Sequence, residues 1–301
     1  MNQIKILANN IEFEVLIEGE SDKLILLLHG FPDDAKSYTH LMQNLSAAGY
    51  MCAAPYMRGY YPTSVPENVK SSQFATIQIA DLAEDCAELA KILKKKFNIK
   101  QVFLVGHDWG AIAAYGAVNF QPEIYSKAAM MSVPPGGTFL RNLIMNPGQF
   151  ARSWYILFFQ LPILPENTIE NTHGEFIRSL WHSWSSNSEK FSDRISEVIA
   201  TLSQPFALRA ALAYYRGLLR PPLNEWARWN QSRELFLSNV KVPSLVMTGS
   251  DDNCIAKSMF ESCELDLESS GGKFKEIAHA GHFLPLEAPD AIAKELISFF
   301  S

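Results

Sequence analysis

The chain has 301 residues, of which 48% are hydrophobic and 19% charged, and its formal net charge is −6. This composition is typical of a globular protein and excludes intrinsic disorder, and a chain of this length buries a large core without disulfide bonds or metal sites. The mild negative charge offers no electrostatic basis for binding nucleic acid or an anionic membrane.

Short apolar runs alternate with helical patterns at both ends of the chain. Strands are expected at 3–8, 11–18, 24–28, 50–54, 101–105, 127–133, 243–248 and 273–277, and helices at 36–48, 76–97, 111–119 and 289–300. The runs at 24–28 and 101–105 are continuously apolar, as in strands that are buried on both faces. This alternation predicts a mostly parallel sheet that is covered by helices on both sides.

The middle of the chain has a different character. Residues 134–238 contain many prolines, no buried-strand run, and the tryptophans Trp154, Trp181, Trp184, Trp226 and Trp229. Because this helical stretch lies between two strands of the sheet, we interpret it as a cap that is inserted into an α/β core formed by 1–133 and 239–301.

Cysteine usage and the N-terminus indicate a cytoplasmic protein. The four cysteines (Cys52, Cys86, Cys254 and Cys263) form no CxxC motif, so they are expected to be free thiols. Residues 1–19 lack the pattern of a signal peptide, and no apolar stretch reaches the length of a membrane span. No metal-ligand cluster or phosphate-binding glycine loop is visible, so neither a metal nor a cofactor is expected.

The segment 106–110 (GHDWG) directly follows one of the buried strands and precedes an alanine-rich helix. Small residues two positions before and after a central side chain permit the sharp turn that raises a nucleophile above the edge of the sheet. Serine usually occupies the centre of this turn, but here it is Asp108. Capping of the following helix is the alternative role, although a cap does not require glycine on both sides. We therefore predict that Asp108 is a nucleophile.

Two segments near the C-terminus supply partners for such a nucleophile. His282 follows the last strand, from where a histidine can reach over the sheet edge, and His279 is the competing candidate. Asp251 and Asp252 follow the strand at 243–248, and we choose Asp252 because it lies three residues after the glycine that ends this strand. The order nucleophile, acid, base is that of the α/β-hydrolase fold. The predicted triad is Asp108, His282 and Asp252.

The segment 29–32 (HGFP) follows the buried strand at 24–28. From this position the backbone N–H of Phe31 is expected to pair with that of Trp109 as an oxyanion hole. A cis peptide bond is expected between Phe31 and Pro32, because the proline must turn the chain sharply here.

The chemistry of an aspartate nucleophile differs from that of a serine. A serine attacks an acyl carbon, whereas a carboxylate displaces a leaving group from an sp³ carbon and becomes an alkyl ester. Water that is activated by the histidine then attacks the carbonyl carbon of this ester, and the oxyanion hole stabilises the tetrahedral intermediate. Asp108 therefore favours epoxide opening or dehalogenation over ester hydrolysis.

The chain resembles the epoxide hydrolase and haloalkane dehalogenase branch of the α/β-hydrolases. The resemblance lies in the segments HGFP (29–32), MRGY (57–60), GHDWG (106–110), GSDD (249–252) and AGHF (280–283). It implies an α/β-hydrolase core, a cap at 134–238 that closes over the substrate, and the triad of Asp108, His282 and Asp252.

The resemblance also implies which cap residues meet the substrate. Epoxide hydrolases use two cap tyrosines as acids toward the ring oxygen, and the second precedes an arginine, as Tyr215 does here; a core tyrosine is its alternative role. Phe158 stands where the first tyrosine is expected, and Tyr155 lies one helical turn earlier. Tyr155 can replace the missing hydroxyl, or Tyr215 acts alone. The residues expected to bind the substrate are Trp109, Tyr155, Phe158 and Tyr215.

The leading hypothesis is a hydrolase that opens an epoxide to a vicinal diol through an alkyl ester on Asp108. A haloalkane dehalogenase with the same triad is the alternative. Phe31 occupies the position of the second residue that donates a hydrogen bond to the halide in that family, and a phenyl ring cannot donate a hydrogen bond. A haloacid substrate is disfavoured, because Trp109 and Ala111 stand where arginines would bind its carboxylate. A non-catalytic receptor and an ordinary esterase are the remaining hypotheses. The expected partners are a small apolar-bodied substrate and water.

Overall fold

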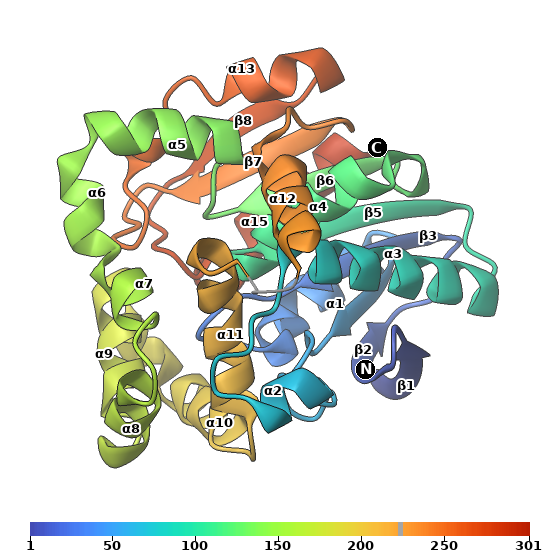
Figure 1. The fold of residues 1–301 in the computed structure, drawn as a ribbon. Coiled ribbons are helices and arrows are strands. Elements are labelled where there is room, and N and C mark those ends of the chain that lie inside the picture. Colours follow the sequence, from blue (N-terminus) through green and yellow to red (C-terminus); the bar gives the residue numbers. More distant parts are fainter. Residues whose placement is uncertain (222–224) are drawn as a thin grey trace.

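An eight-stranded sheet forms the centre of the computed structural model, which describes residues 1–221 and 225–301 (Figure 1). Its strands are β1 (Asn2–Ala8), β2 (Ile11–Glu18), β3 (Lys23–Leu28), β4 (Met51–Pro55), β5 (Gln101–His107), β6 (Lys127–Met131), β7 (Ser244–Gly249) and β8 (Lys273–Ile277). They lie in the order β1-β2-β4-β3-β5-β6-β7-β8, and β2 alone runs in the direction opposite to the other strands. The predicted fold class, an α/β-hydrolase fold with a mostly parallel sheet, is confirmed.

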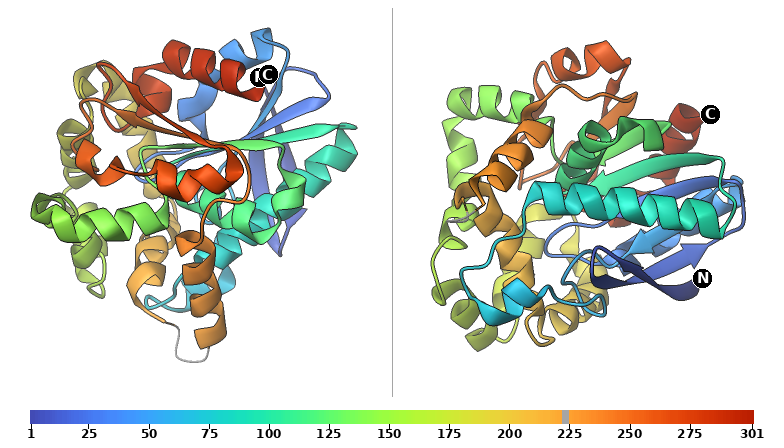
Figure 2. Two further views of the ribbon diagram at one scale, coloured as in Figure 1. Left: turned by 90° about the horizontal axis from the view of Figure 1, so that it is seen from above. Right: turned by 45° about the vertical axis from the view of Figure 1, so that its right-hand side comes forward.

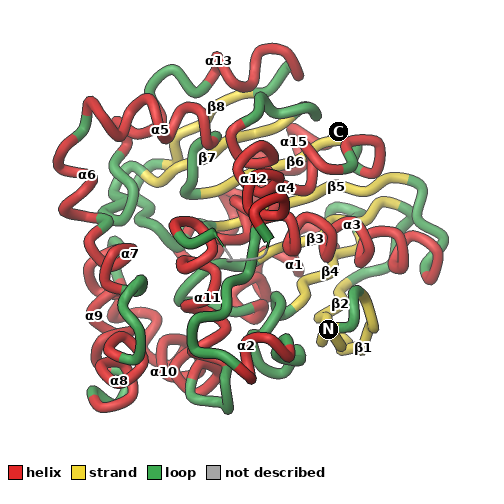
Figure 3. Tube along the Cα trace, viewed as in Figure 1, coloured by secondary structure: helices red, strands yellow, loops and turns green. Residues whose placement is uncertain are grey.

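Helices cover both faces of this sheet, as the alternation of elements predicts (Figure 3). They are α1 (Thr39–Ala47), α2 (Glu67–Ser71), α3 (Ile79–Lys96), α4 (Trp109–Phe120), α5 (Gly136–Met145), α6 (Pro147–Arg152), α7 (Trp154–Phe158), α8 (Leu164–Asn171), α9 (Glu175–Trp184), α10 (Ser192–Leu202), α11 (Ala207–Leu219), α12 (Trp226–Leu237), α13 (Glu264–Leu267), α14 (Leu284–Glu287) and α15 (Pro289–Phe300). Helices α1 and α15 lie on one face, and α3 and α4 lie on the other (Figure 2). None of these helices is both long and apolar enough to cross a membrane.

Most predicted elements are present, and the differences have local causes. The strand at 273–277 and the helix at 289–300 have the predicted bounds. The strand predicted at 127–133 ends at Met131, because Ser132 adopts a left-handed backbone with φ 64° that a strand cannot continue. The long helix predicted from residue 76 begins at Ile79, since Gln78 forms a capping box with Asp81.

The predicted cap segment folds as a chain of helices, α5 to α12. Most of it lies beside the carboxyl ends of the strands, while α12 returns to the core and packs on α3 and α4 (Figure 1). Several hydrogen bonds fasten α12 there, including those of Ser232 and Asn119. The N–H of Ala80 donates to Ser232 Oγ at 3.1 Å, and Asn119 Nδ2 donates to the carbonyl of Leu235 at 2.8 Å. The segments that follow β3, β5, β7 and β8 therefore lie at the edge of the sheet that faces the cap.

Candidate active site

Asp108 lies at the tight turn between β5 and α4, with the unusual backbone angles φ 52° and ψ −117°. This turn requires the flanking glycines. A Cβ on Gly106 would come within 2.1 Å of the Gly110 carbonyl oxygen, and a Cβ on Gly110 within 1.9 Å of the Leu28 carbonyl oxygen. The Asp108 side chain makes no capping hydrogen bond to α4, so the alternative role of helix cap does not hold.

The structure brings His282 and Asp252 together with Asp108. His282 Nδ1 lies 2.9 Å from Asp252 Oδ2, and His282 Nε2 lies 3.6 Å from Asp108 Oδ2. The other carboxylate oxygen of Asp252 accepts backbone N–H bonds from Cys254 and Ile255 at 2.8 and 3.0 Å. These bonds fix the carboxylate so that it faces the imidazole, and all three side chains are buried.

The two competing candidates lie elsewhere. His279 is exposed, and its backbone N–H donates to Ser250 Oγ. Asp251 is also exposed, and its carboxylate accepts the hydroxyl hydrogen of that same serine. Among the described residues, neither side chain forms a hydrogen bond or an ion pair with Asp108.

His107, which was not predicted from the sequence, also takes part in the site. Its Nε2 donates to the carbonyl of His282 at 2.7 Å, and Ser132 Oγ donates to the same oxygen at 2.7 Å. Burial and the nearby His282 lower the pKa of His107 to about 3, so its imidazole is neutral and donates as the Nε2–H tautomer. Its place in the turn, next to Asp108, is the signal that could have identified it.

The charges of the three predicted triad residues are strongly coupled. Burial disfavours the imidazolium of His282, but the carboxylates of Asp252 and Asp108 outweigh this effect and raise its pKa to about 10. Burial likewise opposes ionisation of Asp108, yet the hydrogen bond and charge of His282 hold its pKa below the usual range. These shifts favour an imidazolium at His282 beside an ionised Asp108.

The HGFP loop presents a donor to Asp108. The N–H of Phe31 donates to Asp108 Oδ1 at 2.8 Å, and the peptide bond from Phe31 to Pro32 is cis, as predicted. Gly30 permits this approach, since a Cβ there would lie 2.4 Å from the Asp108 Cβ. Trp109 is the first residue of α4, and in the described part of the chain its N–H makes no hydrogen bond to the Asp108 side chain.

A cavity of about 570 Å³ lies above Asp108. Apart from Asp108, its lining is largely apolar and includes the predicted residues Trp109, Tyr155 and Tyr215, but not Phe158. Phe158 instead packs in the cap against Trp154, Phe159 and Phe176. A second hollow of about 690 Å³ among α8 to α11 contains none of the predicted site residues.

The two cavity tyrosines are both buried in their protonated form. The Tyr215 hydroxyl has no hydrogen-bond partner among the described residues, and the Tyr155 hydroxyl lies 3.4 Å from Cys254 Sγ. Burial raises the pKa of both phenols well above the ordinary value. The two rings meet edge to face, with 5.8 Å between their centroids.

Comparison with known proteins settles the family. The sequence pattern described as "alpha/beta hydrolase fold" matches residues 23–289. The chain belongs to this family. Among the relatives of this α/β-hydrolase, the AB hydrolase superfamily protein YfhM of Bacillus subtilis (strain 168) is 28% identical over 96% of this chain and 94% of its own.

Relatives named as epoxide hydrolases confirm the predicted branch and an enzyme of this kind. Epoxide hydrolase 2 of Caenorhabditis elegans is 26% identical over 94% of this α/β-hydrolase and 75% of its own length. The crystal structure of epoxide hydrolase VrEH1 from Vigna radiata is 26% identical and superposes with a TM-score of 0.76, covering 99% of this chain and 97% of that one.

The MRGY segment positions the cap helix that carries Tyr215. Gly59 has φ 81°, and a Cβ there would lie 2.4 Å from that of Ala210 on α11. The Tyr214 hydroxyl donates to the carbonyl of Arg58 at 2.8 Å, while the Arg58 guanidinium forms an ion pair with Asp85 on α3. Helix α11 is thereby held close to the core, with Tyr215 in the cavity.

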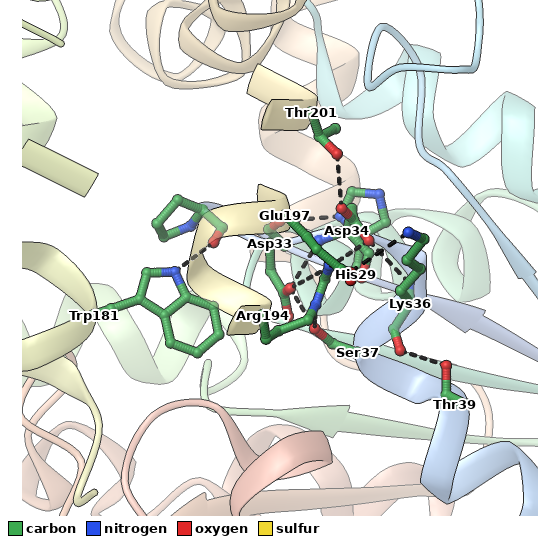
Figure 4. A network of polar contacts seen from close by, with 12 residues as sticks. His29, Asp33, Asp34, Lys36, Ser37, Thr39, Trp181, Arg194, Glu197 and Thr201 are labelled. Carbon is green, nitrogen blue, oxygen red and sulfur yellow. Dashed lines mark hydrogen bonds and ion pairs between the residues drawn. The ribbon is translucent and has the colours of Figure 1, made fainter. Parts of the chain in front are cut away.

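A buried polar network attaches the rest of the cap to the loop that carries Phe31 (Figure 4). Arg194 on α10 forms ion pairs with Asp33, at 3.2 Å, and with Asp34. Trp181 Nε1 on α9 donates to the Pro32 carbonyl at 2.9 Å. Burial raises the pKa of Asp33 to about 6, although Arg194 opposes this effect. The same loop thus contacts both Asp108 and the cap.

The described residues contain no group of three or more His, Cys, Asp or Glu side chains placed to hold a metal ion. All four cysteines are buried free thiols, as predicted.

Proposed function

We propose that this protein hydrolyses epoxides to vicinal diols through an alkyl ester on Asp108. The observation that carries the proposal is one apolar cavity shared by the Asp108 carboxylate and the buried hydroxyls of Tyr155 and Tyr215. Behind the carboxylate, His282 and Asp252 form a hydrogen-bonded pair. The relatives named as epoxide hydrolases support the same chemistry.

In the first step, Asp108 Oδ2 attacks one carbon of the epoxide, and the bond from this carbon to the ring oxygen breaks. The ring oxygen takes the phenolic proton of Tyr215 or Tyr155 and becomes a hydroxyl group. Both phenols are protonated and buried, so each can donate to an oxygen on which negative charge develops. Oδ1 remains on the N–H of Phe31 and becomes the carbonyl oxygen of the ester.

Ester formation itself prepares the base for the second step. Esterification removes the negative charge of Asp108, which is one of the two carboxylates that raise the pKa of His282. The pKa of the imidazolium therefore falls, and its proton passes to the tyrosinate, which restores the phenol. His282 becomes a neutral imidazole at the stage when water must be deprotonated.

In the second step, His282 Nε2 takes a proton from water, and the hydroxide attacks Asp108 Cγ. The oxyanion that forms on Oδ1 is stabilised by the N–H of Phe31. Collapse of the intermediate expels the diol oxygen, which takes the proton of the new carboxyl group. The carboxylate and the imidazolium are then both restored, so no cofactor is consumed.

Substitution of His282 by glutamine is expected to trap the ester. A glutamine side chain cannot deprotonate water, so the first step proceeds and the second is blocked. Incubation with a panel of epoxides and haloalkanes, followed by intact-protein mass spectrometry, measures the adduct. An increase by the mass of the whole epoxide means ring opening, because nothing leaves the molecule.

The other outcomes of this experiment separate the alternatives. An increase by an alkyl group without its halogen means dehalogenation and overturns the proposed substrate class. An unchanged mass in a folded protein argues for a ligand receptor. The Asp108→Ala/His282→Gln double variant serves as the matched control, since an adduct on it would place the nucleophile elsewhere.

The two tyrosines are expected to share the activation of the ring oxygen. Tyr215→Phe and Tyr155→Phe should each slow ester formation by about 10–100-fold, and the double variant by at least about 10³-fold, because general acids contribute on this scale. Rapid-quench measurement of ester formation in the His282→Gln background isolates this step.

Tyr214→Phe is the matched control for this prediction. Its hydroxyl lies outside the cavity and donates to the Arg58 carbonyl, so this variant measures how much of a rate loss comes from displacement of α11 and not from a lost acid. An unchanged rate in Tyr215→Phe would remove Tyr215 from the reaction. A loss only in Tyr155→Phe would assign the acid to Tyr155 alone.

A further inference from the structure

Helices α5, α6 and α7 follow one another along one edge of the molecule (Figure 1). Their outer side carries six large apolar side chains that are between 48% and 81% exposed, and we call this set the apolar flank: Leu140, Ile144, Met145, Phe150, Trp154 and Leu157. Scattered apolar residues are normal on a protein surface, but a gathering of this kind usually marks a surface that binds a partner.

The segment that carries the apolar flank has charges of one sign only. Residues 124–165 contain no aspartate or glutamate, whereas Arg141 and Arg152 lie within the flank helices. Arg152 is exposed and donates to the backbone carbonyl of Asn253, and Arg141 forms an ion pair with Asp266. Arg233, also exposed, lines the cavity that three residues of the flank share. Arg152 and Arg233 therefore place positive charge beside the flank, which favours an apolar partner with anionic groups at its surface.

The active-site cavity opens through this flank. Leu140, Phe150 and Leu157 line the cavity and are at the same time 48%, 56% and 64% exposed. A folded protein seated on the flank, including a second copy of this chain, would cover the side chains that frame the opening. A lipid layer covers the same side chains and still lets apolar molecules pass from its interior into the cavity.

We propose that the apolar flank docks this protein on an anionic lipid surface, from which apolar substrates enter the cavity directly. The flank side chains would enter the boundary between headgroups and acyl chains, with Trp154 at the interface and the arginine heads directed to the lipid phosphates. The substrate part of this inference rests on the proposed function, whereas the docking requires no turnover. Net charge alone predicts no membrane partner, because it reports on the whole surface and not on one exposed flank.

Sedimentation with sucrose-loaded vesicles of phosphatidylcholine and phosphatidylserine tests the docking. The variant Ile144→Gln/Met145→Gln removes the two most exposed members, at 81% and 77%, and neither lines the cavity. Its ratio of vesicle-bound to free protein should be at least about tenfold lower than that of the wild type, since each side chain loses its transfer into the lipid. Hydrolysis of a dissolved small epoxide should be unchanged.

The matched control is Leu7→Gln/Phe74→Gln, at two apolar side chains that are 72% and 55% exposed on β1 and on the segment before α3, outside the flank. It should bind vesicles as the wild type does. Equal losses in both double variants, or a wild type that does not sediment with vesicles, would overturn the proposal. So would a wild-type dimer in solution that Ile144→Gln/Met145→Gln converts to a monomer, because the flank would then bind a second copy.

The Asp108→Ala variant separates this inference from the proposed function. It should bind vesicles as well as the wild type does, because the flank is intact. If the wild type hydrolyses dissolved epoxides but binds no vesicles, only the docking is wrong. If it binds vesicles and no epoxide reacts, the docking stands, while the proposed function and the substrate part fall together.

Discussion

Replacement of Asp108 by alanine is expected to lower epoxide turnover by at least about 10⁴-fold, with the fold retained. The carboxylate is the group that would form the ester, and no other described carboxylate of the cavity lining lies in its place. Asp108→Asn tests the same role with a side chain of nearly equal shape, and Asn tolerates the positive φ of 52° at this turn better than most residues.

Steady-state rates together with circular dichroism and a thermal unfolding curve check this prediction. The unfolding curve matters, because a lost rate in a misfolded protein would say nothing about the nucleophile. Retention of more than about 1% of the wild-type rate by a folded Asp108→Ala variant would contradict the covalent mechanism, since the loss of a nucleophile costs far more than that. Direct attack of water on the epoxide would then be the better description.

Much of the site could be predicted because its residues follow strand ends. In a parallel sheet the carboxyl ends of neighbouring strands meet at one edge, so the loops that carry Phe31, Asp108, Asp252 and His282 converge without any knowledge of long-range contacts. Apolar runs and glycine positions identify these loops from local sequence alone. The choice of His282 over His279 depended on the local pattern, and the buried and exposed positions of the two side chains agree with it.

The cap could not be predicted to the same depth. Arg194 meets Asp33 and Asp34 across about half of the chain, and no local pattern encodes such a pairing. Tyr155 and Phe158 lie three residues apart on the five-residue helix α7, so helical periodicity places them on one face. Tertiary packing separates them: Tyr155 faces the cavity, whereas Phe158 packs against Trp154 and Phe176.

The second large effect is expected from Asp252→Asn, with Asp251→Asn as its matched control. The two aspartates are adjacent, but only Asp252 is buried and faces His282 Nδ1, at 2.9 Å. An amide can turn its NH₂ group toward the ring and favour the wrong tautomer, and the analogous change in serine hydrolases costs about 10⁴-fold. We expect a loss of about 10³–10⁴-fold for Asp252→Asn and little change for Asp251→Asn.

The same pair of variants should differ in how stability depends on pH. His282 has a folded-state pKa of about 10, above its value in the unfolded chain, so the native state binds the extra proton. Its contribution to the free energy of unfolding is fully present below about pH 6.5 and is lost as the pH rises through about 10. Without the Asp252 carboxylate the pKa of His282 should fall, and this loss should shrink.

Urea unfolding at neutral pH and near pH 10 measures this dependence. Asp251→Asn should reproduce the wild-type decrease, and Asp252→Asn should show a smaller one, because exposed groups titrate alike in both variants and cancel in the comparison. Equal decreases in the two variants would mean that Asp252 does not hold the proton on His282. The proposed order of steps, in which esterification of Asp108 converts an imidazolium into a base, would then be wrong. The ester itself could still form.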